Sequence, residues 1–192
     1  MIEGLHLKLI LIGDSGVGKT TFASRITNSE CSASHVPTIG SGYFSYTFMN
    51  NDVPINVDIW DTAGQEMYRS LVPQYARNSH CVIIVFDLTN EQTFLHIDNW
   101  LRFIEDQISD VKILLFGNKN DLQDKRQVDS QRASQYALSK NMFYAEGSAI
   151  EGTDIEASVQ SICVEKYEEL KDHLTLEESR PIPAEKDEKP CC

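Results

Sequence analysis

Residues 13–20 have the composition of a loop that binds phosphate groups. They are Gly-Asp-Ser-Gly-Val-Gly-Lys-Thr and fit the pattern G-x-x-x-x-G-K-[ST], with an apolar run at 5–12 before them and a helical stretch at 21–27 after them. Glycines let a backbone wrap closely around an anion, and amide groups at a helix N-terminus face that anion. We therefore predict that Lys19 contacts the β- and γ-phosphates of a nucleotide and that the Thr20 hydroxyl binds Mg²⁺. The residues expected to line the phosphates are Ser15, Gly16, Val17, Gly18, Lys19 and Thr20.

The tetrapeptide at 61–64 could supply a metal ligand and a second phosphate contact. It is Asp-Thr-Ala-Gly, fits D-x-x-G, and follows a run that ends at Trp60. Protein sites usually hold Mg²⁺ through one or two carboxylates, waters and the phosphates of the substrate. Asp61 is therefore predicted to hold the metal through water, and the Gly64 amide to contact a γ-phosphate. Taken alone, such a tetrapeptide is also common in ordinary loops.

The tetrapeptide at 118–121, Asn-Lys-Asn-Asp, indicates which base the nucleotide carries. The Asp121 carboxylate can accept hydrogen bonds from guanine N1–H and from the 2-amino group together. Adenine offers neither donor there, and a buried acceptor without a partner costs binding energy. We expect Asn118 to brace the guanine against the phosphate loop and the Lys119 stem to lie over the ring. This string too is weak when it stands alone.

Apolar runs alternate with helical patterns along most of the chain, which predicts a doubly wound α/β sheet. The runs at 82–86 and 112–117 are continuously apolar, as expected of central parallel strands. Two alternating runs flank Asn50-Asn51-Asp52 and predict a hairpin. We expect a P-loop NTPase fold with a six-stranded, mostly parallel sheet, one antiparallel edge strand and about five helices. The strands are expected at 5–12, 43–48, 55–60, 82–86, 112–117 and 142–144, and helices at 21–27, 94–108, 130–140 and 153–170.

The composition excludes several classes of protein. The 192 residues are 41% hydrophobic and 24% charged, which is ordinary for a globular domain. With 17 Lys and Arg against 29 Asp and Glu, the formal net charge of −12 repels nucleic acid and anionic lipid. No apolar run approaches the roughly 18 residues that span a bilayer, and the first residues do not form a signal peptide. Five cysteines without C-x-x-C spacing indicate neither a zinc site nor a disulfide framework, and favour the reducing cytosol.

The composition changes near residue 170. Pro181, Pro183 and Pro190 are half of the six prolines in the chain, and the residues between them are mostly charged. Such a segment cannot bury enough apolar surface to fold. We therefore predict a nucleotide-binding domain at 1–170 and a disordered tail at 171–192.

Together these motifs resemble those of the Ras superfamily of small GTPases and, within it, the Rab family. The resemblance covers about residues 5–170. It includes Pro37-Thr38-Ile39-Gly40, Trp60 to Glu66, the segment Tyr68 to Tyr75, and Ser148-Ala149. It implies that the chain binds guanine nucleotide with Mg²⁺ as cofactor, GTP as substrate and GDP as product.

Several site residues follow only from this resemblance. Thr38 would join Mg²⁺ and sense the γ-phosphate, and Gln65 would orient the attacking water; with Lys19 they form the expected catalytic set. The site that binds the base would be completed by Ser148, Ala149 and Ile150. No arginine finger can be assigned in the sequence, so intrinsic hydrolysis is expected to be slow until an activating protein raises it by about 10³- to 10⁵-fold.

The resemblance also implies surfaces for partners. Tyr43, Trp60 and Tyr75 match the aromatic trio on which Rab effectors dock, although ordinary aromatics on a sheet would show the same spacing. Cys191-Cys192 is not a C-a-a-X box and resembles the Rab end that accepts two geranylgeranyl groups. One lipid chain binds a protein to a membrane only marginally, whereas two lipid chains anchor the protein stably. The alternative is that both thiols remain unmodified.

A chain of this family would act as a monomeric switch. The expected protein partners are effectors, an exchange factor, a GTPase-activating protein and an escort or GDI-type protein that masks the lipids, and no nucleic acid is expected. We expect it in the cytosol and on the cytoplasmic face of an intracellular membrane. The segments 69–73 and 122–128 favour a Golgi membrane, with an endosomal one as the other expectation.

Two other functions remain open from the sequence. One is a nucleotide-gated binding module with negligible GTP hydrolysis, which Thr38 and Gln65 argue against. The other is a P-loop kinase or ATPase, which would require a preference for adenine that Asp121 opposes.

Three positions depart from the family pattern. The aromatic that usually packs against guanine, twelve residues after the loop lysine, is Cys31; the lysine that usually covers the base is Ile150; and the residues after Ile39-Gly40 are Ser41-Gly42-Tyr43. The polar recognition of guanine is retained, while an aromatic contact worth about 0.5–1.5 kcal/mol is lost.

We therefore predict that GDP leaves this chain faster than is usual for the family, by up to about tenfold. Restoring the aromatic with Cys31→Phe should slow release by a similar factor. The measurement is the rate at which a fluorescent GDP analogue dissociates from each protein, and equal rates would contradict the prediction.

Overall fold

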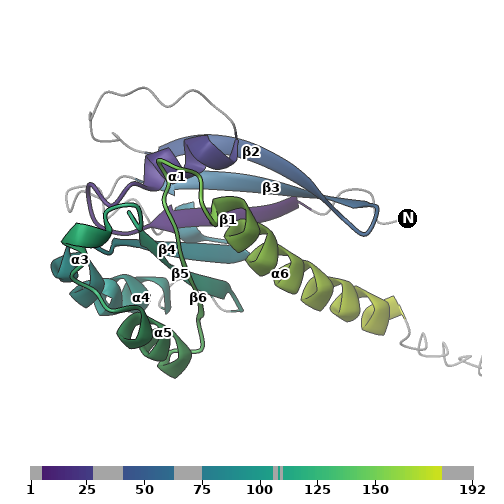
Figure 1. The fold of residues 1–192 in the computed structure, drawn as a ribbon. Coiled ribbons are helices and arrows are strands. Elements are labelled where there is room, and N and C mark those ends of the chain that lie inside the picture. Colours follow the sequence, from purple (N-terminus) through teal and green to yellow (C-terminus); the bar gives the residue numbers. More distant parts are fainter. Residues whose placement is uncertain (1–5, 28–40, 63–74, 106–107, 109, 179–192) are drawn as a thin grey trace, which may run out of the picture.

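Six strands form one sheet in the order β2-β3-β1-β4-β5-β6 (Figure 1). The computed structural model describes residues 6–27, 41–62, 75–105, 108 and 110–178. β2 pairs antiparallel with β3, and the other neighbouring strands are parallel, which confirms the expected sheet. The strands are β1 His6–Ile12, β2 Ser41–Asn50, β3 Val53–Thr62, β4 Cys81–Asp87, β5 Lys112–Asn118 and β6 Phe143–Glu146.

The strand sequences explain their places in the sheet. β4 is buried at all seven positions and is apolar up to its last residue, as a central strand covered on both faces must be. The β2–β3 hairpin turns at Asn51 and Asp52, whose φ angles are 45° and 66°. Two consecutive positive φ angles are typical of the two-residue turn that suits the twist of a hairpin, and Asn and Asp tolerate them. Both hairpin strands extend beyond the expected 43–48 and 55–60.

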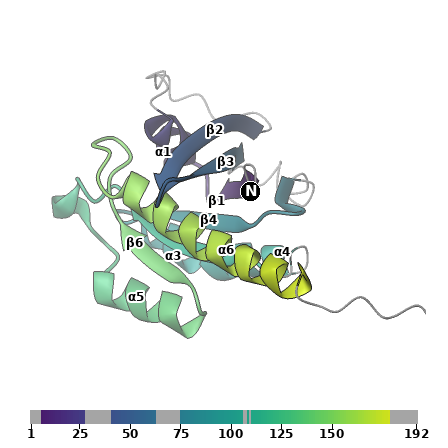
Figure 2. The same ribbon diagram turned by 90° about the vertical axis from the view of Figure 1, so that its right-hand side faces the viewer.

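Helices cover both faces of the sheet, so the described residues contain two cores. α1 and α6 pack on one face, and α3, α4 and α5 pack on the other. In Figure 2, α6 crosses in front of the strands while α3 and α4 lie behind them. The helices are α1 Lys19–Ile26, α3 Glu91–Leu95, α4 Ile97–Glu105, α5 Ser130–Ser139 and α6 Ile155–Glu178, with a 3₁₀ turn, η2, at Gln123–Lys125.

The alternation of side chains in β1 supplies both cores. Leu9 and Leu11 pack toward α1 and α6, whereas Ile10 and Ile12 pack toward α3, α4 and α5. All four are fully buried. The second half of β1, Leu9 to Ile12, is therefore apolar at every position, because successive side chains point to opposite faces of the sheet.

Two helices differ from the expectation. The single helix expected over 94–108 is divided at His96, whose carbonyl accepts hydrogen bonds from the amides of both Asn99 and Trp100. Such shared bonds tighten a helix locally and are typical of helix ends. α6 continues to Glu178 instead of ending at 170, because residues 171–178 contain no Gly or Pro and are mostly good helix formers.

The carboxyl ends of β1, β3, β4 and β5 meet at one edge of the sheet, since these strands are parallel. These strands end at Ile12, Thr62, Asp87 and Asn118. In open α/β sheets, ligands bind outside this edge. The loop at 13–18, Asp61 and the tetrapeptide at 118–121 all lie at this edge, and the loop at 148–152 follows β6, the next strand of the sheet.

Candidate nucleotide-binding site

The loop at 13–18 joins β1 to α1 and approaches its neighbours too closely for any residue but glycine at two positions. Gly13 has φ +139°, and a Cβ there would lie 2.1 Å from the Val85 carbonyl oxygen. Gly18 has φ +99°, and a Cβ would lie 2.4 Å from Nδ2 of Asn118. The glycines therefore allow the loop to pack against both β4 and the loop after β5.

Lys19 begins α1 and its side chain folds back across this loop. Nζ donates to the carbonyl oxygens of Gly13, at 2.9 Å, and Asp14, at 2.8 Å. The side chain is buried, and this burial lowers the pKa of Lys19 to about 8, although the charges of Asp61 and Asp14 oppose the shift. The ammonium is thus held within the cradle that the sequence assigns to phosphates.

Thr20 and Asp61 form a pair of oxygen ligands suited to Mg²⁺. The Thr20 hydroxyl donates to Oδ2 of Asp61 at 2.5 Å, while Oδ1 of Asp61 is buried and has no hydrogen-bond partner within the described parts of the chain. Burial raises the pKa of the Asp61 carboxyl. A buried carboxylate oxygen without a partner is costly, and a cation that it shares with substrate phosphates and waters would satisfy it. The residues present therefore fit a magnesium ion.

Asn118 connects the phosphate loop to the loops that surround the base. Its side chain is buried; Nδ2 donates to the Val17 carbonyl at 2.7 Å, and Oδ1 accepts from the Ala149 amide at 2.9 Å. Asn118 thus links Val17 of the phosphate loop to Ala149 of the loop at 148–152 through two hydrogen bonds. Three residues further on, Oδ1 of Asp121 is also buried, with no hydrogen-bond partner among the described residues.

Lys119 is held in place by a residue that the sequence analysis missed. Its backbone has φ +68°, and Nζ lies 2.7 Å from Oδ2 of Asp87, the last residue of β4. The other Asp87 oxygen accepts from both the amide and the hydroxyl of Thr89. A carboxylate at the carboxyl end of a central parallel strand is a signal that would have identified Asp87.

The loop at 148–152 is ordered by its own turn and by α1. The Ser148 hydroxyl accepts from the Glu151 amide at 3.1 Å, and both Ser148 and Ala149 are buried. Arg25 donates from Nε to the Ala149 carbonyl at 3.2 Å and from its terminal nitrogen to the Ile150 carbonyl. Nothing in the sequence pointed to Arg25. Ile150 is 66% exposed.

The aromatic trio is contiguous on the surface of the hairpin side of the sheet. The rings of Tyr43 and Trp60 lie 5.5 Å apart, and those of Trp60 and Tyr75 lie 5.6 Å apart. Tyr43 is 57% exposed and its hydroxyl donates to Asp58 at 2.7 Å. The structure thus brings together three residues that are far apart in the chain.

Some predicted residues lie outside the described parts of the chain. They are Cys31, Thr38, Gly64, Gln65, Cys191 and Cys192. Within the described residues, no helix is both long and apolar enough to cross a bilayer, and no cluster of three or more His, Cys, Asp or Glu side chains could hold a metal ion.

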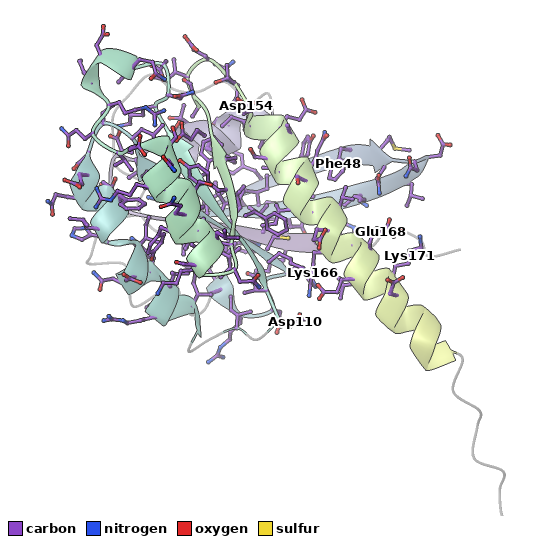
Figure 3. The ribbon with its side chains drawn as sticks, turned by 60° about the horizontal axis from the view of Figure 1, so that its bottom comes forward. Phe48, Asp110, Asp154, Lys166, Glu168 and Lys171 are labelled. Carbon is purple, nitrogen blue, oxygen red and sulfur yellow. The ribbon has the colours of Figure 1, made fainter. Side chains whose placement is uncertain are left out.

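A hollow of about 300 Å³ lies at the other edge of the sheet, where β4 and β5 begin. Lys166 of α6 lines it and is buried; Figure 3 shows this side chain beside Asp110. The Lys166 ammonium donates to the carbonyl and carboxylate oxygens of Asp110, at 2.9 and 2.7 Å, and to Glu169 at 3.1 Å. Its three donors are satisfied by this chain, so the hollow lacks the unpaired positive charge that phosphates require.

The phosphate loop, the metal pair and the base loop thus converge where parallel strands end, which places the chain among the P-loop nucleotide-binding proteins. Residues 8–168 match the Ras family. The chain is 37% identical to Ras-related protein YPTC6 of Chlamydomonas reinhardtii over 176 residues, which cover 91% of this chain and 82% of that protein.

Two mammalian proteins are similar to the same degree. Ras-related protein Rab-8B of Pongo abelii is 40% identical over 150 residues, covering 78% of this chain and 72% of the relative. Ras-related protein Rab-25 of Mus musculus is 36% identical over 161 residues, covering 83% and 76%. The chain belongs to the Ras family and is a Rab-type small GTPase that hydrolyses GTP. Membership of this family disfavours both a binding module without hydrolysis and a P-loop kinase or ATPase.

The pKa of Lys19 makes GDP affinity sensitive to alkaline pH. Without nucleotide, the pKa of Lys19 is about 8 because its side chain is buried. Bound phosphates would keep the ammonium charged, so above that pH the binding of GDP takes up a proton and weakens as pH rises. We expect an affinity loss of about tenfold between about pH 7 and about pH 9.

Equilibrium binding of a fluorescent GDP analogue at fixed Mg²⁺ measures this loss. Lys8→Met is the matched control, because burial also lowers the pKa of Lys8 but its ammonium bonds the Arg77 carbonyl, away from the loop. The control should keep the same pH profile as the natural chain. An affinity that stays constant across this range would contradict the assignment of Lys19.

Proposed function

We propose that this GTPase is a membrane-anchored switch, which recruits effectors in vesicle trafficking while it holds GTP and releases them after hydrolysis. The observation that carries the nucleotide part is the pair of buried carboxylate oxygens, on Asp61 and Asp121, that find no partner among the residues the structure describes. Buried acceptors of this kind are rare in native proteins unless a ligand completes them. One faces the metal position beside Thr20, and the other lies in the loop that would read the base.

The loop residues divide the nucleotide between them. Amides of Ser15, Gly16, Val17 and Gly18 line the phosphates, and Lys19 reaches the β- and γ-phosphates. Asp121 selects guanine. Lys119 lies over the ring, and its ion pair with Asp87 supports that position. Ser148 and Ala149 form the floor of the base site, and Ile150 lies at its exposed rim.

Hydrolysis requires residues from two segments, around 34–42 and 62–76, which we call the switch segments. Thr20, Thr38 and Asp61 would hold Mg²⁺, which neutralises the charge that develops on the phosphates. Thr38 and the Gly64 amide sense the γ-phosphate, and Gln65 orients the attacking water. The hydrolysis removes the γ-phosphate that both segments contact, so the segments around 34–42 and 62–76 lose their order and the effector its surface. A slow intrinsic rate, raised by an activating protein, makes the reaction a timer.

The aromatic trio supports the effector part of the proposal. The rings of Tyr43, Trp60 and Tyr75 pack one against the next and are partly exposed, beside the segments proposed to change with the nucleotide. Large aromatic side chains are preferred anchors of protein interfaces. Effectors dock on this trio, an exchange factor and an activating protein act on the adjoining segments, and an escort or GDI-type protein covers the lipids of the monomeric chain.

The last two cysteines support the membrane part. Geranylgeranyl groups on Cys191 and Cys192 anchor the chain to the cytoplasmic face of an intracellular membrane, of Golgi or endosomal type, and the masked form resides in the cytosol. The acidic tail gains nothing from anionic lipid, so the lipid groups carry the attachment.

The base preference tests the nucleotide site. Asp121→Asn replaces one acceptor by an amide donor, which suits the 2-carbonyl of xanthine and opposes the 2-amino group of guanine. We expect GDP affinity to fall by at least about a hundredfold while affinity for xanthosine diphosphate rises. Competition binding with both nucleotides measures the change. Asp124→Asn, on the exposed η2 turn, should leave the preference intact, and an unchanged guanine preference in Asp121→Asn would refute the assignment.

The location of a tagged chain tests the anchor. The natural chain should fractionate with membranes in cells, and Cys191→Ser combined with Cys192→Ser should move it to the cytosol, because two lipids are lost. Lys186→Ser combined with Lys189→Ser alters the same tail and keeps the cysteines, so it should remain on membranes. Membrane attachment of the double serine variant would overturn the lipid anchor.

A further inference from the structure

The side chain of Asp14, the second residue of the phosphate loop, is hydrogen-bonded to the α3–α4 helices, on the opposite side of the site from α1. Nδ1 of His96, between α3 and α4, lies 2.6 Å from Oδ2 of Asp14. The indole N–H of Trp100, in α4, donates to Oδ1 at 2.9 Å. Each carboxylate oxygen thus has a nitrogen partner, and because a carboxylate only accepts, Nδ1 of His96 is the donor in its pair. Residues four apart face the same side of a helix, which explains how both reach one carboxylate.

The main chain of Asp14 is bonded to the lysine that the phosphates require. Its carbonyl oxygen accepts from Lys19 Nζ at 2.8 Å. The Asp14 side chain is only 15% exposed, and Trp100 is buried against the core of that face. One residue therefore links the α3–α4 junction, through its side chain, to the ammonium of Lys19, through its carbonyl.

The phosphate loop needs such restraint because glycines make it intrinsically flexible. Gly13, Gly16 and Gly18 all have positive φ angles, and glycine loses more conformational freedom on ordering than any other residue. The second half of the loop is fixed by Val17, whose side chain is buried and whose carbonyl accepts from Asn118. Asp14 supplies the corresponding attachment for the first half.

The helix that holds Asp14 is itself fixed. Asp98 of α4 accepts from the hydroxyl of Tyr136, on α5, and pairs with Lys140, the residue that follows α5, both at 3.0 Å. Trp100, Leu101 and Ile104 of α4 are buried in the core beneath it. A donor on this helix therefore has a defined position relative to the sheet, which a donor on a surface loop would lack.

We propose that His96 and Trp100 are positioning residues for the bound nucleotide, which act through Asp14 to hold the phosphate loop and Lys19 in the geometry that retains the β-phosphate. This inference rests on the proposed role of the loop. His96 is the residue where the α3–α4 helix is divided, and its donor belongs to a half-exposed side chain that the core does not require. The two donors and Asp14 are called the Asp14 clamp below.

The rate of GDP release tests the Asp14 clamp. His96→Leu keeps an apolar side chain of similar size without a donor and should release a fluorescent GDP analogue about three- to tenfold faster. His96→Asn carries an amide nitrogen at the same distance along the side chain as Nδ1, so it should restore release to within about twofold of the natural rate. Trp100→Phe should also accelerate release, and Leu95→Ala, at the exposed neighbouring position, should not.

A double-mutant cycle shows whether the effect passes through Asp14. Asp14→Ala should accelerate release, and His96→Leu added to it should cause no further change, because both remove the same contact. Natural release from His96→Leu, equal release from His96→Asn and His96→Leu, or independent effects of the two substitutions would each overturn the proposal. Thermal unfolding of each variant separates these effects from a general loss of stability.

A second measurement requires no nucleotide. The chain has two tryptophans, so the indole N–H signals of Trp60 and Trp100 in a ¹H–¹⁵N spectrum are assigned by Trp100→Phe. The Trp100 signal should move in Asp14→Ala, and a signal that stays in place would overturn the clamp. If the natural chain retains no guanine nucleotide, the proposed function fails and the positioning role fails with it. Retained nucleotide with unchanged release overturns the clamp alone.

Discussion

The Asn118 side chain is the contact on which the rest of the site depends. Its buried amide donates to the Val17 carbonyl and accepts from the Ala149 amide, so one side chain fixes the distance between the phosphate loop and the base loops. The same amide occupies the space that a Cβ on Gly18 would need. The asparagine at 118 therefore requires a glycine at 18. The loop must approach the end of β5 this closely if a single nucleotide is to contact both.

Several buried charged or polar groups lie at this edge of the sheet, and they are unfavourable unless a ligand pairs with them. Burial lowers the pKa of Lys19 and raises the pKa of the Asp61 carboxyl, and carboxylate oxygens of Asp61 and Asp121 lack partners. Each of these costs stability in the empty site. A nucleotide with Mg²⁺ would supply the missing partners, and whatever binds only the folded state adds to its stability. We therefore expect the folded state to be more stable with nucleotide and Mg²⁺ bound than without them.

The sequence allowed the strands, the loop at 13–18 and the placing of its motifs at the carboxyl ends of strands to be predicted, because each depends on local composition. Apolar runs indicate burial, and the glycines of 13–18 indicate that the loop backbone lies close to its neighbours. The contacts that support the site could not be predicted in this way. Arg25 and the Asp87–Lys119 pair depend on which loops the topology brings together. The division of the helix at His96 and the extension of α6 to Glu178 depend on packing and on helix propensity beyond the last core residue. Roles carried by Thr38 and Gln65 rested on resemblance alone.

The acidic composition constrains how this site gains its affinity. With a net charge of −12, the molecule as a whole repels an incoming nucleotide, but that field is screened within about 8 Å at physiological ionic strength. The attraction must therefore come from short-range groups, namely the backbone amides of the loop, the Lys19 ammonium and the metal that Thr20 and Asp61 would hold. Short-range contacts slow release more than they speed association. A partner that shifts the loop by a small distance would then change the lifetime of the bound state, which is the property that the proposed switch requires.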